Sequence, residues 1–356
     1  MKAGRIISSV LAAAILLTGC AKGNISTVSE MTASPSTSES LHISETSETS
    51  ETVYEPPFEY NPHLYSALIA TEVPQENWDS LYNLADALRA GEDTFECSSQ
   101  EAYDWCMDSG ILANLIPAAC MKISGISNDG TAPYEDGFGR IYYEMPVEEF
   151  VQRENEFEEA VEDVLNTCLE KDDTDFEKCL KLYDYMESNY YYDYDGTAFS
   201  KSGDGYVYYT FFNHTGQCID FGSLYAFLLL QAGVEAISVG CFDELDHEWT
   251  YVVIDGQGYH IDPTWALKEG YTGDLSLDYF MMSDDIRTET GCPVTDLTVQ
   301  LLPGFWLNNS SLTLPATDES YYAGLFTTLE RLDEDNKILY YTDADGSVLT
   351  LDYRDI

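Results

Sequence analysis

One segment near the middle of the chain constrains the fold most. The stretch "GQCIDFGSLYAFLLLQAG", Gly216 to Gly233, places a cysteine directly before a long apolar run that is predicted to be helical from Ile219 to Ala232. Gly233 is a typical residue to end such a helix. Three strand-like runs follow, "EAISVGCF", "HEWTYVVI" and "YHIDPTW", and the "DGQG" between the last two predicts a hairpin. This order of elements predicts an α+β fold in which the helix packs on an antiparallel sheet.

The regions on either side of this segment differ in their patterns. Residues 61–120 are mainly helical, since "ENWDSLYNLADALRAGE" repeats apolar residues on one helix face. A predicted strand, "GRIYYEM", precedes two amphipathic helices, "PVEEFVQRENEFEEAVEDVLNTCLE" and "TDFEKCLKLYDYMESNY". "DYFMMSDDI" is expected to form a turn or a short helix. Beyond residue 296, short runs such as "KILYYTDADGSVLTLDY" predict a small C-terminal sheet.

The first twenty residues indicate export. Lys2 and Arg5 precede an apolar stretch, Ile6 to Leu17, that is shorter than a membrane span and typical of a secretory signal. The stretch ends in "LTGC", which resembles the lipobox of bacterial lipoproteins. This resemblance implies cleavage before Cys20, lipid modification of its thiol, and an extracytoplasmic protein anchored to the bacterial cell membrane. The alternative is an ordinary secreted protein in which Cys20 is incidental.

The next residues lack the composition of a folded domain. Residues 21–57 are rich in Ser, Thr and Glu, carry the tandem "SETSETSET", and contain few large apolar side chains. Such a stretch cannot bury enough surface to offset the entropy lost on ordering. We interpret it as a disordered tether.

Charge and cysteine content limit the function further. The formal net charge of −48 repels phosphate backbones and excludes nucleic acid as a partner. The chain has nine cysteines; without Cys20 and a possible nucleophile their number is odd, and no CxxC pair occurs. This pattern argues against a disulfide framework and against a structural zinc site, although a single disulfide stays open. No metal site and no cofactor are predicted.

Three residues in order could form a nucleophilic site. Cys218 begins the predicted helix, where the helix dipole favours a thiolate. His247 stands at the head of one strand, and Asp262 lies on the strand paired with it. Opposed side chains of paired strands come within hydrogen-bonding reach, so Asp262 could orient the imidazole that activates the thiol. Cys218 alone would be interpreted as a core residue; the three residues together favour catalysis.

These motifs resemble the transglutaminase-like superfamily. "GQC" before a helix, "HEW" on a strand and "HIDPTW" on the next match that pattern across about residues 174–285. The superfamily contains transglutaminases, cysteine peptidases and amidases, and peptide N-glycanases. The resemblance implies a papain-like core with Cys218 as nucleophile, His247 as general base and acid, and Asp262 as the residue that orients the imidazole.

Several residues next to the motifs could also shape the site. Glu248 stands where the family commonly has a small residue, and on a strand it is expected to point away from His247. Gln217 is a candidate oxyanion donor beside the backbone N–H of Cys218. Trp249 and Trp265 are expected to wall the site or to fill the core.

The sequence therefore predicts five regions and one principal activity. The regions are a lipoprotein signal peptide (1–20), a tether (21–57), a mainly helical part (58–150), a transglutaminase-like core (151–295) and a β-rich segment (296–356). The expected activity is that of a cysteine hydrolase or acyltransferase acting on peptide or carboxamide bonds, with a peptide or protein substrate. Hydrolysis and transamidation share every step before the acceptor enters, so both stay open. The alternative is a catalytically silent binding or scaffolding lipoprotein of the same fold.

Overall fold

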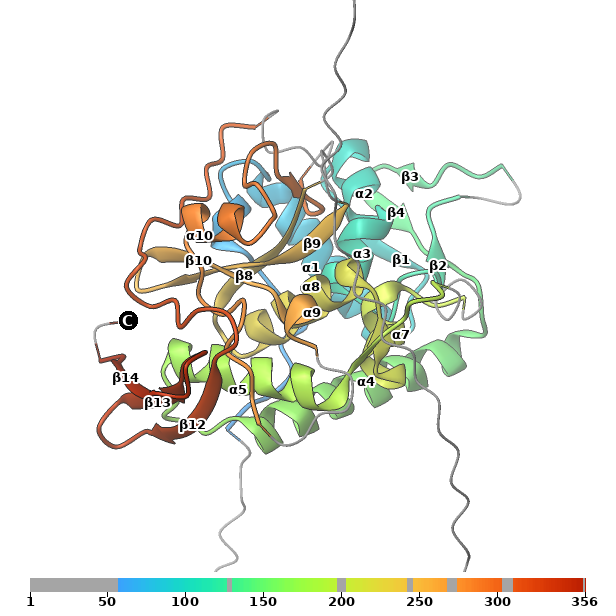
Figure 1. Ribbon diagram of the computed structural model, residues 1–356. Helices are drawn as coiled ribbons and strands as arrows, with labels where there is room; N and C mark the ends of the chain where they lie inside the picture. The colour runs from blue at the N-terminus through green and yellow to red at the C-terminus, as the bar shows by residue number, and fades with distance from the viewer. Residues whose placement is uncertain are drawn as a thin grey trace, which may run out of the picture. The chain divides into compact units, whose positions relative to one another are not determined.

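Helix α8, Cys218–Gln231, lies at the centre of the computed structural model and packs on a four-stranded antiparallel sheet (Figure 1). The strands lie in the order β10-β9-β8-β11. Their bounds are Glu235–Cys241 (β8), His247–Ile254 (β9), Gln257–Ile261 (β10) and Thr298–Val299 (β11). Gly222 allows the helix to approach the sheet closely, because a Cβ there would lie 3.2 Å from the backbone of Trp249. The predicted α+β fold is confirmed.

The structure describes residues 57–126, 130–196, 203–241, 246–267, 274–302, 310–354 and 356. The predicted signal peptide with Cys20, and residues 21–56 of the predicted tether, lie outside this set. Within the described residues, no helix is long and apolar enough to cross a membrane. Tyr54–Ile356 form one compact unit, and its buried apolar side chains make one contiguous core. The domain boundaries proposed at residues 150 and 295 stay predictions.

The N-terminal part combines short helices with two small sheets. α1 packs against α2, β1 and α4. The elements are η1 Ala67–Ile69, α1 Gln75–Ala90, β1 Thr94–Glu96, α2 Gln100–Cys106, α3 Ser109–Leu115, β2 Ile123–Ser124, β3 Tyr134–Glu135, β4 Phe138–Arg140 and β5 Tyr142–Tyr143. The single strand predicted for "GRIYYEM" is wrong in extent. β4 pairs with β1 and β3 whereas β5 pairs with β2, so the chain changes sheets at Ile141.

Two long helices run along one side of the core (Figure 1). They are α4, Val147–Cys168, and α5, Asp175–Asn189, and both were predicted from their amphipathic patterns. α5 begins with a capping box in which Thr174 and Glu177 satisfy each other's backbone N–H groups. The shorter elements that lead to α8 are β6 Tyr191–Tyr192, α7 Tyr206–Asn213 and β7 Thr215–Gly216.

The C-terminal residues form a three-stranded antiparallel sheet at one end of α5 (Figure 1). Its strands are β12 Thr328–Asp333, β13 Ile338–Thr342 and β14 Val348–Asp352. The Tyr353 ring stacks on Phe176 of α5 with ring centroids 4.6 Å apart. The buried carboxylate of Glu177 accepts hydrogen bonds from the Lys337 ammonium and the Tyr353 hydroxyl, each at 2.8 Å. These contacts fix the sheet on the helix.

The strand predicted for "YHIDPTW" ends earlier than expected. β10 stops at Ile261, because Pro263 has no backbone N–H to continue a ladder. Asp262 instead caps the short helix α9, Pro263–Ala266, and so lies one residue beyond the strand. A further short helix, α10, Asp284–Glu289, packs beside β10 (Figure 1).

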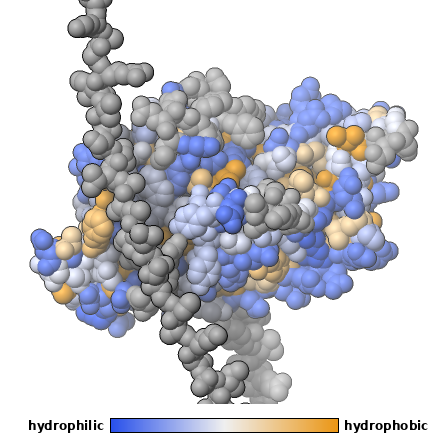
Figure 2. All heavy atoms as spheres, turned by 45° about the vertical axis from the view of Figure 1, so that its right-hand side comes forward, coloured by the Kyte–Doolittle hydropathy of each residue, from blue (hydrophilic) through white to orange (hydrophobic). Residues whose placement is uncertain are grey.

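The described surface is mainly hydrophilic. On the face drawn in Figure 2, hydrophilic residues cover most of the described surface and apolar residues form small, separate patches.

Candidate active site

The local backbone presents Cys218 at the first turn of α8. β7 pairs in parallel with β6, and this pairing leads the chain to Gln217, the N-cap residue of the helix. The backbone N–H of Gln217 donates to the Asp220 carboxylate at 2.6 Å. Position 216 requires glycine, because a Cβ there would lie 2.7 Å from the Asp220 side chain. Cys218 is a free, partly exposed thiol in the positive field of the helix N-terminus.

His247 and Asp262 form a buried pair next to this thiol. The His247 Nε2 donates to Asp262 Oδ2 at 2.7 Å, and their side chains are only 4% and 0% exposed. The other oxygen of Asp262 accepts the backbone N–H groups of Thr264 and Trp265 at 3.0 and 3.2 Å. Since Nε2 is the donor to the carboxylate, Nδ1 is the imidazole nitrogen left for Cys218. The structure thus brings Cys218, His247 and Asp262 together.

His247 and Asp262 each favour the charged form of the other. Burial alone lowers the pKa of His247, but the charge and hydrogen bond of Asp262, together with the neighbouring Cys218, raise that pKa to about 9. Burial of the Asp262 carboxyl raises its pKa and so favours the neutral form. The charges of His247 and Arg287 outweigh it and hold the pKa of Asp262 below its usual value. The pair therefore favours an imidazolium next to a carboxylate.

Arg287 of α10 is a member of this site that the sequence analysis missed. Its Nη2 donates to Asp262 Oδ2 at 3.0 Å, and its side chain is fully buried. The guanidinium lies 4.4 Å from the ring centroid of Trp249 and 4.5 Å from that of Trp265. One sequence signal could have identified it: Arg287 is the one Lys or Arg between Lys268 and Arg331.

Aromatic rings hold the imidazole in place. Trp265 stacks on His247 with centroids 4.5 Å apart and planes inclined by 18°, and Trp249 lies 6.0 Å from the same ring. Tyr279 packs edge-on against Trp265. Trp249 is wholly buried, whereas Trp265 is partly exposed, so the first fills the core and the second walls the site.

A second histidine orients Trp249 from behind. His260 is fully buried; its Nδ1 accepts from the Trp249 indole N–H at 2.9 Å and its Nε2 donates to Asp284 at 2.9 Å. Burial lowers the pKa of His260, so that it is neutral at physiological pH. His260 is therefore a structural residue of the site.

The segment after α9 completes the wall. Its backbone runs beside the end of β10: the N–H of Asp262 donates to the carbonyl of Tyr279 at 3.0 Å, and His260 and Met282 exchange hydrogen bonds of 2.8 Å. Tyr279 and Met281 have φ values of 64° and 58°, in the left-handed region. Such conformations cost free energy, and the surrounding contacts maintain them here.

A pocket of 400 Å³ opens above the thiol and the imidazole. It is lined by Tyr192, Tyr194, Cys218, Asp246, His247, Thr264, Trp265, Leu267 and Tyr279. Most of its wall is aromatic, and Asp246 supplies an acidic group beside the imidazole. Asp262 and Arg287 lie behind the pocket, since both side chains are fully buried.

Gln217 does not face this pocket. Its side-chain amide donates to the backbone carbonyl of Asp193 at 3.1 Å, and it lines a separate pocket of 420 Å³ with Tyr206 and Asp220. Its role as an oxyanion donor stays a prediction. Glu248 points away from His247, as expected of the next residue on a strand, and hydrogen-bonds Gln300 at 3.1 Å.

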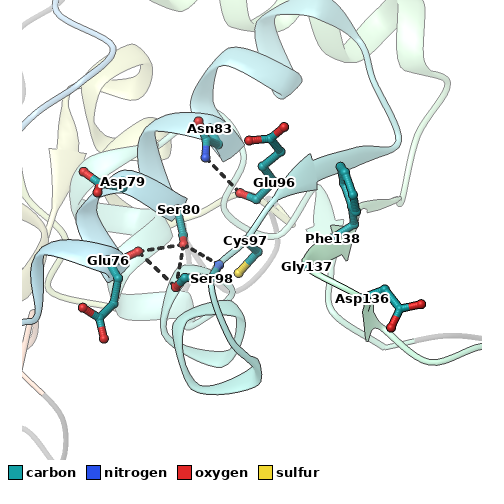
Figure 3. Close-up of a pocket in the computed structure, with 10 residues that line it drawn as sticks. All are labelled: Glu76, Asp79, Ser80, Asn83, Glu96, Cys97, Ser98, Asp136, Gly137 and Phe138. Carbon is teal, nitrogen blue, oxygen red and sulfur yellow. Dashed lines mark hydrogen bonds between the residues drawn. The ribbon is translucent and has the colours of Figure 1, made fainter.

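A third pocket, of 380 Å³, lies in the N-terminal region between α1 and the β1 and β4 strands (Figure 3). Acidic and hydroxyl side chains line it. The Ser80 hydroxyl donates to the backbone carbonyl of Glu76 at 2.7 Å and so is not oriented toward a catalytic base. None of the residues drawn there is a histidine. No group of three or more His, Cys, Asp or Glu in the described part of the chain could hold a metal ion.

One family model matches part of the chain. Residues 162–263 match the model of the transglutaminase-like superfamily. The matched range contains Cys218, His247 and Asp262 and ends before Arg287 and Tyr279. A search of curated proteins finds no match to the chain.

Proposed function

From the transglutaminase-like domain at residues 162–263, we propose that the protein is a cysteine hydrolase or acyltransferase acting on peptide or carboxamide bonds through Cys218, His247 and Asp262. The observation that carries this proposal is the buried His247–Asp262 pair, 2.7 Å apart, beside a partly exposed thiol at a 400 Å³ pocket. Ionisable groups with perturbed pKa values that lie beside a pocket are concentrated at functional sites.

The proposed reaction proceeds through a thioester. His247 takes the thiol proton, and the Cys218 sulfur attacks the carbonyl carbon of the substrate to form a tetrahedral intermediate. His247 then passes that proton to the leaving nitrogen as the C–N bond breaks. An acceptor, either water or an amine, loses its proton to His247 and attacks the thioester. The proton returns to the sulfur as the thiol leaves.

The helix start supplies the oxyanion donor in this scheme. The backbone N–H of Cys218 belongs to the first turn of α8, where N–H groups have no acceptor within the helix. Gln217 could add a second donor only by releasing its hydrogen bond to the carbonyl of Asp193.

The pocket favours substrates without negative charge. Its aromatic walls offer flat apolar surfaces, and Asp246 repels carboxylates. A neutral carboxamide carried on a peptide fits this lining. We further propose that the protein acts outside the cytoplasm, held to the membrane through a lipid on Cys20 and the tether of residues 21–57. The alternative function is a silent binding or scaffolding protein, in which the aromatic pocket holds a ligand and the thiol is inert.

The reactivity of the thiol tests the proposal without a known substrate. In the Cys20→Ser chain, alkylation by iodoacetamide is followed at each cysteine by mass spectrometry across pH. Cys168 is the internal control, since it is also partly exposed, and burial raises the pKa of its thiol to about 11. We expect Cys218 to react about 100-fold faster than Cys168 at pH 6, because thiolate is the reacting form.

The His247→Ala variant identifies the base. It should reduce the rate at Cys218 to that at Cys168 and leave Cys168 unchanged. Equal rates at the two thiols in the unmodified site, or no effect of His247→Ala, would refute the enzymatic proposal and favour the silent alternative.

A further inference from the structure

Arg287 is a buried cation that the proposed reaction does not use. It comes from α10, outside the range matched by the family model, and its side chain is fully buried. Asp262 Oδ2 accepts two hydrogen bonds, from His247 at 2.7 Å and from Arg287 at 3.0 Å. Asp262 Oδ1 is occupied by two backbone N–H groups. The carboxylate is thus in contact with two different cationic groups at one oxygen.

We infer that Arg287 is a positioning residue that keeps Asp262 ionised in those steps of the catalytic cycle in which His247 is neutral. The inference rests on the proposed function, because only a working cycle removes the proton from His247.

The charge of His247 changes during the proposed reaction. In the proposed reaction the imidazole is positive after it takes the thiol proton and neutral after it gives that proton to the leaving nitrogen. A fully buried carboxylate beside a neutral imidazole has no full counter-charge, and burial then favours uptake of a proton. Protonation of Asp262 would remove the acceptor that orients the Nε2–H, and the imidazole could no longer serve as base for the acceptor water or amine.

Arg287 opposes protonation of Asp262 throughout the cycle, because the charge of the guanidinium does not change. A guanidinium stays protonated at every pH at which proteins fold. Among the described residues, it is the one Lys or Arg that hydrogen-bonds Asp262. A second buried carboxylate shows what happens without a directly bonded cation. Glu154 has an oxygen without any hydrogen-bond partner, and burial together with the charge of Glu158 raises its pKa to about 8, although the charges of Arg89 and Arg153 lower it. For Asp262, the charges of His247 and Arg287 overcome the same burial.

The other titratable groups around the pair do not replace this charge. Burial raises the pKa of Tyr183 on α5, of Tyr279 on the adjoining segment and of Tyr322, so these hydroxyls are neutral. Burial also raises the pKa of the Cys292 thiol to about 12. Two acidic neighbours remain: Asp246, which lines the pocket with His247, and Asp284, which is hydrogen-bonded to His260.

The two tryptophans hold the guanidinium where it is needed. Trp249 and Trp265 place their rings 4.4 and 4.5 Å from it, and Trp265 also stacks on His247. A planar guanidinium can stack on both rings and donate to a carboxylate in its own plane, whereas a lysine ammonium cannot. Arg287, the two rings and His247 therefore form one packed group.

The first test replaces His247 and leaves Arg287 intact. In a Cys20→Ser, His247→Gln chain, the glutamine amide can donate to Asp262 as a neutral imidazole does. The charge of Asp262 is read from aspartate side-chain carbons by 13C NMR, assigned by comparison with an Asp262→Asn chain. We expect Asp262 to be ionised at pH 7 in His247→Gln and protonated at pH 7 in the His247→Gln, Arg287→Met double variant, because burial then acts on the carboxyl without a neighbouring cation. A protonated Asp262 in His247→Gln would overturn the inference, as would an ionised Asp262 in a folded double variant.

The second test measures the thiol and separates positioning from mere packing. Arg287→Met keeps the bulk of the side chain, and Arg287→Lys keeps a charge. Loss of the neighbouring cation makes the imidazolium of His247 more stable. The inflection at high pH in the pH profile of Cys218 alkylation, which marks loss of the imidazolium proton, should therefore move to higher pH. We expect a shift of about one pH unit in Arg287→Met and a smaller shift in Arg287→Lys. If Arg287→Met lowers the melting temperature but leaves this inflection at the same pH, Arg287 has a structural role only.

The two proposals can fail separately. If His247→Ala leaves the alkylation of Cys218 unchanged, the enzymatic proposal fails. If His247→Ala slows alkylation but Asp262 takes up a proton in His247→Gln at pH 7, the thiol is activated and the role assigned to Arg287 is refuted.

Discussion

The raised pKa of His247 predicts how the stability of the protein depends on pH. The imidazole has a pKa of about 9 in the folded protein against a usual value of 6.5. Folding therefore favours its protonated form. This contribution to the free energy of unfolding is fully present below pH 6.5, and it is lost as the pH rises through 9.

The size of the effect follows from the shift. Each pKa unit corresponds to about 1.4 kcal/mol, so a shift of this size contributes about 3 kcal/mol at pH 6 and little above pH 9.5. The histidine is only 4% exposed, so solvent does not screen the interaction as it would at the surface.

The assay compares the chain with its His247→Gln variant. Urea unfolding is followed by tryptophan fluorescence at pH 6 and at pH 9.5, in the Cys20→Ser background. Groups that do not contact His247 titrate alike in both proteins, and their effects cancel in the difference between them. The difference in free energy of unfolding should fall by about 3 kcal/mol from pH 6 to pH 9.5. A difference that changes by less than 1 kcal/mol would show that the imidazole is not stabilised as a cation in the folded state.

Three further changes test the construction around the site. Gly216→Ala introduces a Cβ 2.7 Å from a side chain of the first helical turn, so iodoacetamide should label the candidate thiol at least 10-fold more slowly; an unchanged rate would contradict the placement of the helix start. His260→Ala leaves the buried indole N–H of Trp249 without its acceptor, and thermal unfolding should show a loss of about 1 to 3 kcal/mol. Lys337→Met removes a cation from Glu177, a buried carboxylate, and should lower the melting temperature without altering thiol labelling; altered labelling would mean that the C-terminal sheet acts on the site.

The sequence predicts those elements that neighbouring residues along the chain specify. The apolar run after Cys218 predicts α8 to within one residue at each end, and "DGQG" predicts the hairpin between β9 and β10. The order of Cys218, His247 and Asp262 along these elements was enough to predict that they meet. The end of β10 was misjudged, since Asp262 forms a cap and Pro263 cannot extend a ladder, although both properties are local and readable.

The contacts that depend on distant packing could not be predicted in this way. Arg287 reaches Asp262 because α10 packs beside β10, and no periodicity in "SDDIRTE" specifies that placement. The burial of Glu248 has the same origin: its partner Gln300 comes from the end of β11, far along the chain. Charged residues are usually exposed, so a sequence pattern assigns both of them to the surface.

The functional unit is therefore longer than the range matched by the family model. That range ends at residue 263 and contains the thiol, the imidazole and the carboxylate. It lacks Thr264 and Trp265, whose backbone N–H groups donate to Asp262. It also lacks Tyr279, whose carbonyl accepts the backbone N–H of Asp262, and Arg287, which supplies a counter-charge to the carboxylate. A chain cut after residue 263 would leave Asp262 with one partner of variable charge and would open the wall of the pocket to water. Water would strengthen the screening of every charge in the site and, if the proposed reaction is a transamidation, would compete with the amine for the thioester. We accordingly propose that residues 264–267 and 274–290 belong to the site together with Cys218, His247 and Asp262, because they supply the fixed charge of Arg287 and part of the pocket wall.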